Sequence, residues 1–141
     1  MERMKRVCVA GGRDFDKYAV VDWVLTSRYG HEPGSWIVVS GGARGADSLG
    51  ERFAREYGLA IERYPADWKT HGNQAGPIRN AQMAEAADEL VAFWNGFSRG
   101  TANMIEQMLT RGKPVHVFDY HGLPVHPPYA ENCRRAMRER G

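Results

Sequence analysis

The residues best suited to chemistry lie in three glycine-rich segments, each directly after an apolar run. These are Gly11-Gly12-Arg13-Asp14, the stretch from Ser40 to Asp47, and the stretch from Asn95 to Thr101. Glycine lets backbone N–H groups approach a phosphate without a Cβ in the way. A helix that starts there adds unbonded N–H groups and a partial positive charge. The three segments therefore predict a ligand that carries phosphate.

The second segment gives the strongest of the three signals. Gly41 and Gly42 end an apolar run, Arg44 offers a planar donor fork, and Gly45 opens a helix. Asp47 then falls in the first helical turn, where it would accept a ribose hydroxyl or complement the helix dipole. A single loop of this kind is also ordinary turn chemistry, but three loops at one sheet edge favour a binding site.

A fourth segment, Gly76-Pro77-Ile78-Arg79-Asn80, contains a residue that breaks a local rule. We expect Arg79 in the first turn of a helix, where a cation is unfavourable for the dipole, which points to function. The expected ligand-binding set is Gly11, Gly12, Arg13, Gly41, Gly42, Arg44, Gly45, Asp47, Arg79, Asn80, Gly96, Ser98, Gly100 and Thr101.

The elements that must position these residues alternate between strand and helix. Apolar runs predict strands over 6–10, 36–40, 59–64, 90–94 and 114–118. Helical spacing predicts helices from an N-cap at Asp16 to Tyr29, over 46–57, from Pro77 with Ile78 on the inner face, and around 102–109. Right-handed crossovers then give an α/β, Rossmann-like fold, a mostly parallel sheet of about five strands with helices on both faces. Its ligand would bind at the carboxyl ends of the strands.

We expect one domain over 1–120, and an extension over 121–141 that packs on or flanks it and contains a short helix from Tyr129. The long polar connection 65–76 is a candidate functional loop, since Trp68 or His71 there could meet a base. Trp94 ends a buried strand, so we expect it in the core.

Composition narrows the class of protein. Hydrophobic residues make up 43% and charged residues 26% of the 141-residue chain, which is typical of a globular domain. We expect no secretory signal, no membrane partner and a cytoplasmic location. The net charge of +2 is too mild to indicate nucleic acid. Cys8 and Cys133 predict no disulfide, the spacing of Asp119, His121 and His126 matches no metal site, and we expect no cofactor.

Taken together, four motifs resemble the SLOG superfamily, and more narrowly its YspA-type, cpYpsA-related branch found in bacteria and phages. The motifs are Gly-Gly-Arg-Asp-Phe (11–15), Ser-Gly-Gly-Ala-Arg-Gly-Ala-Asp (40–47), Gly-Pro-Ile-Arg-Asn (76–80) and Ser-Arg-Gly-Thr (98–101). The resemblance implies a nucleotide-binding Rossmann-like domain. The superfamily includes the Lonely Guy phosphoribohydrolases, which cleave a base from a nucleotide, and DprA, which binds single-stranded DNA.

The chain departs from the Lonely Guy pattern at its catalytic glutamate. That position holds Met104, which cannot act as an acid or a base. Arg79 matches the arginine of the Lonely Guy motif and Met83 its methionine, whereas Asn80 replaces a lysine. Catalytic residues are therefore unknown, with Arg79, Asp47 and Asp14 as candidates, and Asp67 as a further carboxylate that could replace the glutamate.

Three functions remain open from the sequence. The favoured one is the binding of a nucleotide-like small molecule, for sensing or sequestration. The alternatives are a nucleoside-monophosphate N-glycosidase and a DprA-like binder of single-stranded DNA, the latter not favoured. The resemblance implies a homo-oligomer, for which Phe97, Met104 and Met108 are the residues to inspect, although ordinary core is the favoured interpretation of all three.

Overall fold

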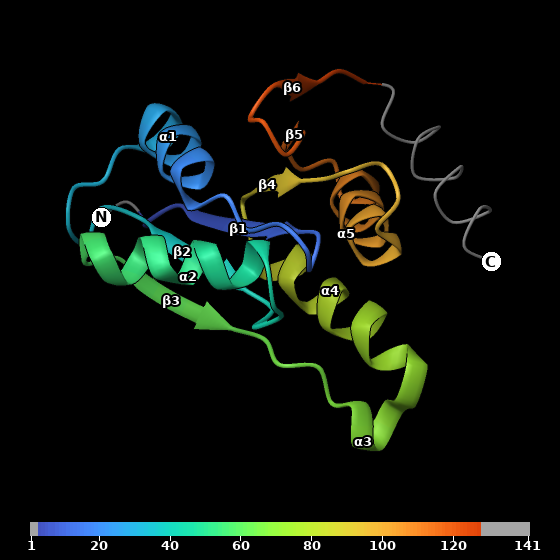
Figure 1. Cartoon of the computed structure of the whole chain (residues 1–141). Coiled ribbons are helices and arrows are strands. Elements are labelled where there is room, and N and C mark those ends of the chain that lie inside the picture. The colour runs from blue at the N-terminus through green and yellow to red at the C-terminus, as the bar shows by residue number, and fades with distance from the viewer. Residues whose placement is uncertain (1–2, 128–141) are drawn as a thin grey trace.

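A six-stranded sheet forms the centre of the computed structural model, which describes residues 3–127 (Figure 1). The strand order is β3-β2-β1-β4-β5-β6, and every pairing except β5 with β6 is parallel. The elements in chain order are β1 (Arg6–Gly11), α1 (Tyr18–Tyr29), β2 (Ile37–Ser40), α2 (Ala46–Tyr57), β3 (Ala60–Arg63), α3 (Trp68–His71), the 3-10 turn η1 (Gly72–Gln74), α4 (Ala75–Ala86), β4 (Glu89–Phe93), α5 (Arg99–Thr110), β5 (Val115–Phe118) and β6 (Pro124–Val125).

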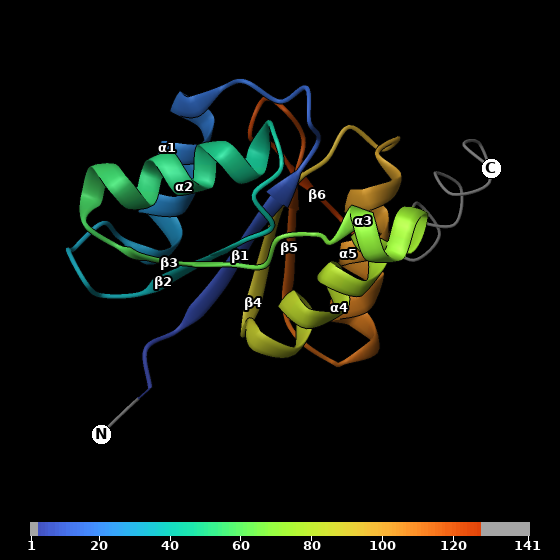
Figure 2. The same ribbon diagram turned by 90° about the horizontal axis from the view of Figure 1, so that it is seen from below.

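The two faces of the sheet bury different helices. Alternate residues of β1 point to opposite faces, so Val7 and Val9 pack with α1 and α2, whereas Cys8 and Ala10 pack with α4 and α5. Figure 2 shows the α1–α2 pair and the α4–α5 pair on opposite sides of the strands. The α/β, Rossmann-type fold predicted from the alternation is confirmed, with β6 as an additional strand.

The strand order reverses between β1 and β4. The chain leaves β1 through α1 on one face and reaches β4 through α4 on the other face. Neighbouring strands whose connections leave on opposite faces open a crevice at their carboxyl ends, which is where open α/β sheets bind ligands. The topology thus places the crevice beside Gly11 and Phe93, which are register partners.

Several local predictions were wrong. Asp16 does not cap α1, because the helix starts at Tyr18 with Lys17 in the cap position. The connection 65–76 is not structureless, because it contains α3 and η1, and α4 begins before Pro77. Ile78 precedes the buried Met83 by five residues, so it lies on the outer side of α4 and is 38% exposed. The earlier start places Arg79 in the second helical turn.

The expected extension begins with residues that join the sheet, since β6 pairs antiparallel with β5. The predicted helix from Tyr129 and Cys133 both lie outside the described residues. Within residues 3–127, no helix is both long and apolar enough to span a membrane.

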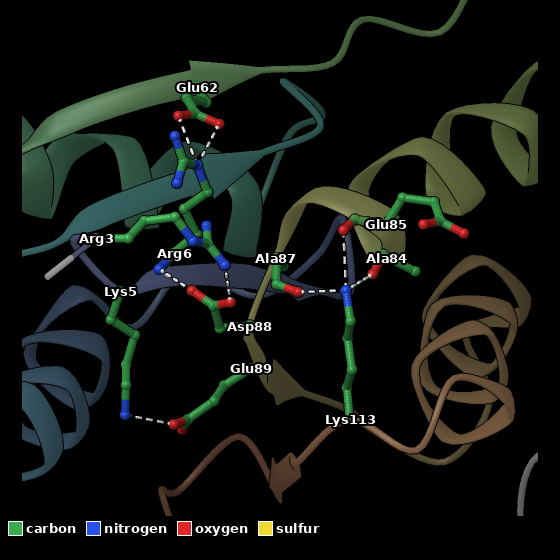
Figure 3. A network of polar contacts seen from close by, with 10 residues as sticks. All are labelled: Arg3, Lys5, Arg6, Glu62, Ala84, Glu85, Ala87, Asp88, Glu89 and Lys113. Atoms are coloured by element: carbon green, nitrogen blue, oxygen red, sulfur yellow. Dashed lines mark hydrogen bonds and ion pairs between the residues drawn. The ribbon is translucent and has the colours of Figure 1, made fainter.

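Charged side chains pair with one another at the amino edge of the sheet, opposite the crevice (Figure 3). Lys113 donates to the carbonyl oxygens of Ala84, Glu85 and Ala87 at 2.7–2.9 Å, where α4 ends. Asp88 accepts from Arg3 and from the backbone N–H of Arg6, and Lys5 donates to Glu89. The Lys113 contacts satisfy carbonyls that the end of a helix leaves unbonded, whereas the other pairs connect the start of β1 to the start of β4.

Candidate functional site

A cavity of about 420 Å³ opens at the carboxyl ends of β1 and β4, where the strand order reverses. It lies between the loop after β1, the start of α2, the middle of α4 and the start of α5. The residues that line it are Ala10, Gly11, Gly12, Arg13, Asp14, Ala43, Asp47, Arg79, Asn80, Met83, Asn95, Ser98, Arg99, Gly100, Thr101 and Met104.

Aromatic packing holds the loop after β1 in place. The Phe15 ring is buried and stacks on Phe93 with centroids 4.9 Å apart, while Tyr120 covers it at 4.8 Å. The Tyr120 hydroxyl donates to Asp14 at 2.6 Å and lies against the backbone of Gly12, leaving no room there for a Cβ. The Gly11–Asp14 backbone is therefore fixed at the cavity wall before any ligand arrives.

The amino end of α5 forms a second wall. Ser98 caps this helix by accepting from the backbone N–H of Thr101, and the side chain of Asn95 accepts from the backbone N–H groups of Phe97 and Ser98. A Cβ on Gly100 would meet open space, so the cavity runs up to the backbone of the first helical turn. An anion in the cavity would meet the positive end of the helix dipole.

Arg79 reaches from α4 across to the loop after β2. Its Nη1 donates to the carbonyl oxygen of Gly41 at 2.7 Å, and its Nε donates to the side chain of Asn80 at 3.0 Å. A Cβ on Gly41 would lie 2.5 Å from the Arg79 Nη1 and 2.8 Å from the Asp47 Oδ2, so a larger residue would displace these two side chains. Asn80 in turn donates to the carbonyl oxygen of Gly100 and to Asn103, which ties α4 to the start of α5. The guanidinium is thus oriented by contacts that engage only part of its donor fork.

Asp47 is a carboxylate buried at the base of this cavity, with 6% of its surface exposed. Burial raises the pKa of Asp47 to about 6. The backbone N–H of Ala43 and the charge of Arg79 favour the ionised form and lower the pKa, but burial has the larger effect. The carboxylate therefore holds its proton more tightly than an exposed aspartate does. It is suited to accept a ligand hydroxyl or to exchange a proton near neutral pH.

A second cavity, of about 530 Å³, adjoins the first and shares Arg13, Ala43 and Arg79 with it. Glu51 at its wall accepts from Ser40 at 2.7 Å and from Arg63 at 2.8 Å. Burial opposes the ionisation of Glu51, but these hydrogen bonds hold its pKa below the ordinary value. The remaining lining residues are Gly41, Gly42, Arg44, Pro65, Ala66 and Trp68.

The structure divides the predicted ligand-binding set between these cavities. Those that line the first cavity are Gly11, Gly12, Arg13, Asp47, Arg79, Asn80, Ser98, Gly100 and Thr101, and those that line the second are Arg13, Gly41, Gly42, Arg44 and Arg79. Gly45 and Gly96 line neither. At Gly45 a Cβ would overlap the backbone of Gly12 and Arg13, so this glycine allows α2 to approach the loop after β1.

The candidate catalytic residues Asp14, Asp47 and Arg79 all line the first cavity. Asp67 does not, because it caps α3 by accepting from the backbone N–H of Thr70 at 3.1 Å. Met104, at the position of the missing glutamate, also lines the first cavity and is 1% exposed. A thioether therefore stands where the Lonely Guy pattern has a carboxylate.

The remaining residues of the loop, core and interface predictions also have defined places. Trp68 lines the second cavity, whereas His71 is exposed and lines neither. Trp94 and Met108 lie in the core, as expected, and Phe97 is 54% exposed.

The expected ligand-binding set omits Asn95, Asn103, Tyr120 and Arg63, although the third glycine-rich segment begins at Asn95. Asn95 directly follows the fourth apolar run, so its place at a strand end was a usable signal. The other three reach the site through tertiary contacts that no local pattern encodes. No three His, Cys, Asp or Glu side chains among residues 3–127 are grouped so as to hold a metal ion.

Comparison with known proteins agrees with this arrangement. A family model described as the YspA, cpYpsA-related SLOG family matches residues 5–71. The Gene 61 protein of Mycobacterium phage D29 is 37% identical over 118 residues, which cover 79% of this chain and 94% of that protein.

A solved structure, that of DNA processing protein A (DprA) from Streptococcus pneumoniae, superposes with a TM-score of 0.67 at 18% identity. The match covers 96% of this chain but only 56% of that one, so the likeness concerns the fold. The matched model, the phage relative and the shared fold together assign this chain to the YspA, cpYpsA-related SLOG family.

Proposed function

We propose that the protein binds a nucleotide or a nucleotide-derived small molecule in the first cavity. The observation that carries the proposal is the convergence, on one cavity at the reversal of strand order, of the Arg79 guanidinium, the amino end of α5 and the buried Asp47 carboxylate. A guanidinium and a helix N-terminus both favour an anion, whereas a carboxylate favours a hydroxyl. A sugar phosphate presents both groups.

The ligand's parts follow from these polarities. The phosphate would lie between the Gly11–Arg13 backbone, Arg79 and the first turn of α5, near Gly100. The ribose hydroxyls would reach Asp47, which accepts in its ionised form. Met83 and Met104 are buried in the wall of the same cavity, which makes that part of the wall apolar and suits the face of a sugar or base.

Hydrolysis of an N-glycosidic bond is a second candidate, favoured by the raised pKa of Asp47. A carboxyl group that titrates near neutral pH could protonate a leaving base or activate water. Met104 argues against this reaction, because it occupies the position of the Lonely Guy catalytic glutamate and its apolar side chain cannot act as an acid or a base. Binding without cleavage is therefore the better-supported function.

Single-stranded DNA is the other alternative, since the structural neighbour is named a DNA processing protein. The exposed Arg13 and Arg44 near the cavities would suit a phosphate backbone. Such binding weakens steeply with salt, because each phosphate contact releases counterions.

One experiment separates these functions. Freshly purified protein is mixed with AMP, GMP, CMP and UMP, and separately with a twelve-residue deoxyribonucleotide, then analysed by native mass spectrometry and calorimetry. Arg79→Gln is the test variant, and Arg52→Gln, on the exposed side of α2, is the matched control.

A retained mononucleotide whose binding Arg79→Gln weakens and Arg52→Gln does not would support the proposal. Free base and ribose phosphate in the mixture would establish the hydrolase instead. Binding of the oligonucleotide alone, with a steep salt dependence, would replace the proposal with the DNA function.

A further inference from the structure

We propose that the second cavity holds a second nucleotide unit, so that the ligand is a dinucleotide whose phosphate linkage crosses Arg79. This inference rests on the proposed function of the first cavity and extends it to the class of ligand. Arg13, Ala43 and Arg79 belong to the walls of both cavities, so the two spaces meet at two guanidinium groups. A linkage between two nucleosides carries its charge at that meeting point.

Trp68 provides the surface on which a second base would stack. Its ring lies on α4 at Gly76, where a Cβ would be 3.4 Å from the ring carbon Cη2, yet the side chain is 51% exposed. A large aromatic ring held on one side and open on the other is the usual arrangement for stacking a base. A mononucleotide in the first cavity would leave this surface unused.

The charges of the second cavity also fit an anionic ligand. Arg63 is paired with Glu51, which neutralises the one carboxylate of the wall. Within residues 3–127, no hydrogen bond or ion pair engages the Arg44 side chain, which is exposed on the loop after β2. Gly42, two residues earlier, lines the same cavity with a φ of +73° and open space at its Cβ position, so its backbone borders the cavity. Arg13, Arg44 and Arg79 together can meet the linkage and a terminal phosphate of the second unit.

The volumes of the two cavities favour a ligand of two nucleotide units over a longer nucleic-acid strand. Each cavity, at about 420 and 530 Å³, is within the range of about 300–1,000 Å³ that single small-ligand sites occupy. A nucleic-acid strand makes many phosphate contacts along a continuous basic track, whereas the whole chain has a formal net charge of +2. Two adjoining sites with a shared cationic boundary match one short, two-part ligand.

Calorimetry with three kinds of probe tests the proposal. The probes are AMP, the dinucleotides pApA and diadenosine diphosphate, and the deoxyadenosine oligomers of four and eight residues. The test variant is Trp68→Ala, which changes an exposed side chain, and the control is Trp23→Ala, an exposed tryptophan on α1 outside both cavities. Thermal unfolding of each variant shows whether the fold is retained.

We expect one of the dinucleotides to bind at least about 10-fold more tightly than AMP, since stacking a base on an aromatic ring is worth about this much. Trp68→Ala should remove that advantage while leaving the affinity for AMP unchanged, and Trp23→Ala should change neither. Arg44→Gln should weaken the dinucleotide alone, by about 5-fold.

Equal affinities for AMP and both dinucleotides, or an equal loss of both on Trp68→Ala, would overturn the inference and leave the proposed function intact. Affinity that continues to rise from two to eight residues would replace the dinucleotide with a nucleic-acid strand. If neither AMP nor a dinucleotide binds, the proposed function fails, and this inference fails with it.

Discussion

The two edges of the same sheet use charge in opposite ways. At the amino edge, Glu89 accepts from Lys5, Tyr29 and His116, and Lys113 meets three carbonyl oxygens. Burial opposes the ionisation of Glu89, but the hydrogen bonds from Lys5 and Tyr29 hold its pKa below the ordinary value. The charged groups of this edge thus stabilise the folded chain.

At the carboxyl edge, burial dominates and the pKa of Asp47 is raised to about 6. Arg79 contacts Gly41 and Asn80, and the exposed Arg44 has no ion partner among residues 3–127. A buried carboxylate that costs stability, beside guanidinium groups with unused donors, is typical of a site kept for a ligand. The difference supports the proposal that the ligand binds at the carboxyl edge, whereas the paired charges of the amino edge serve the fold.

Lys113→Met should give the largest effect and should be confined to stability. Three carbonyls at the end of α4 lose a charged donor, so we expect the free energy of unfolding to fall by about 3 kcal/mol. Urea denaturation measures this, with the exposed Lys17→Met as the control. A loss below 1 kcal/mol would mean that water replaces Lys113 at these carbonyls without cost. The charged groups of the amino edge would then not be important for the stability of the fold.

Arg79→Gln should show the reverse pattern, with an effect on binding. We expect the affinity for a nucleotide to fall about 30-fold, or about 2 kcal/mol, because a charged donor to phosphate is lost. The free energy of unfolding should change by less than about 1 kcal/mol. Calorimetry and urea denaturation on the same samples check both values. A large loss of stability with unchanged affinity would mean that Arg79 serves the fold and not the ligand, contrary to the proposed role of the carboxyl edge.

Asp47→Asn should stabilise the protein at pH 7.5, by about 2 kcal/mol. The folded pKa of about 6 exceeds the ordinary 3.8, so the folded chain binds a proton more tightly than the unfolded chain does. The free energy of unfolding therefore falls as the pH rises between about 4 and 6, and the variant lacks this fall. Thermal melts from pH 4 to 8 measure it, and parallel pH profiles of the two proteins would contradict the prediction.

Glu89→Gln is the matched change at the amino edge, with the opposite sign. The lowered pKa of Glu89 means that its ionised form stabilises the fold at neutral pH, and that this contribution is lost as the pH falls through the folded pKa. We expect a loss of about 1–2 kcal/mol at pH 7.5, since charge-assisted hydrogen bonds become neutral ones. A gain in stability, measured by the same melts, would remove the distinction between the two carboxylates.

Arg3→Ala should have the smallest effect. The Arg3 side chain is 60% exposed, and exposed ion pairs contribute about 0–1 kcal/mol. Asp88 also keeps its hydrogen bond from the backbone N–H of Arg6. Urea denaturation should therefore show a loss below about 1 kcal/mol, and a larger one would show that the pairs of this edge act as a cooperative network.

The sequence predicts the fold well because β1, β2 and β4 are apolar and buried, and because α2 and α5 each have a distinct apolar face. The runs 6–10, 36–40 and 90–94 match β1, β2 and β4 to within one residue at each end. The boundary errors came from tertiary contacts. Asp16 is a good N-cap by residue type, but burial of Phe15 fixes the loop before it and α1 begins later. A residue pattern contains no information about such packing.

The site was predicted less completely than the fold. Glycines after strands identified the loops, because the carboxyl ends of parallel strands share an edge. The same pattern could not separate Gly45, which allows close backbone packing, from Gly100, which borders open space. Nor could it show that Arg44 and Asp47, three residues apart, line different cavities.

The two-residue strand β6 has a consequence for how the folded protein behaves at high concentration. It covers the outer edge of β5 in the antiparallel direction, and its first residue is Pro124, which has no N–H to offer a further strand. Uncovered strand edges are templates for intermolecular pairing and fibril growth. This short strand therefore closes one edge of the sheet and disfavours aggregation by strand pairing at that edge.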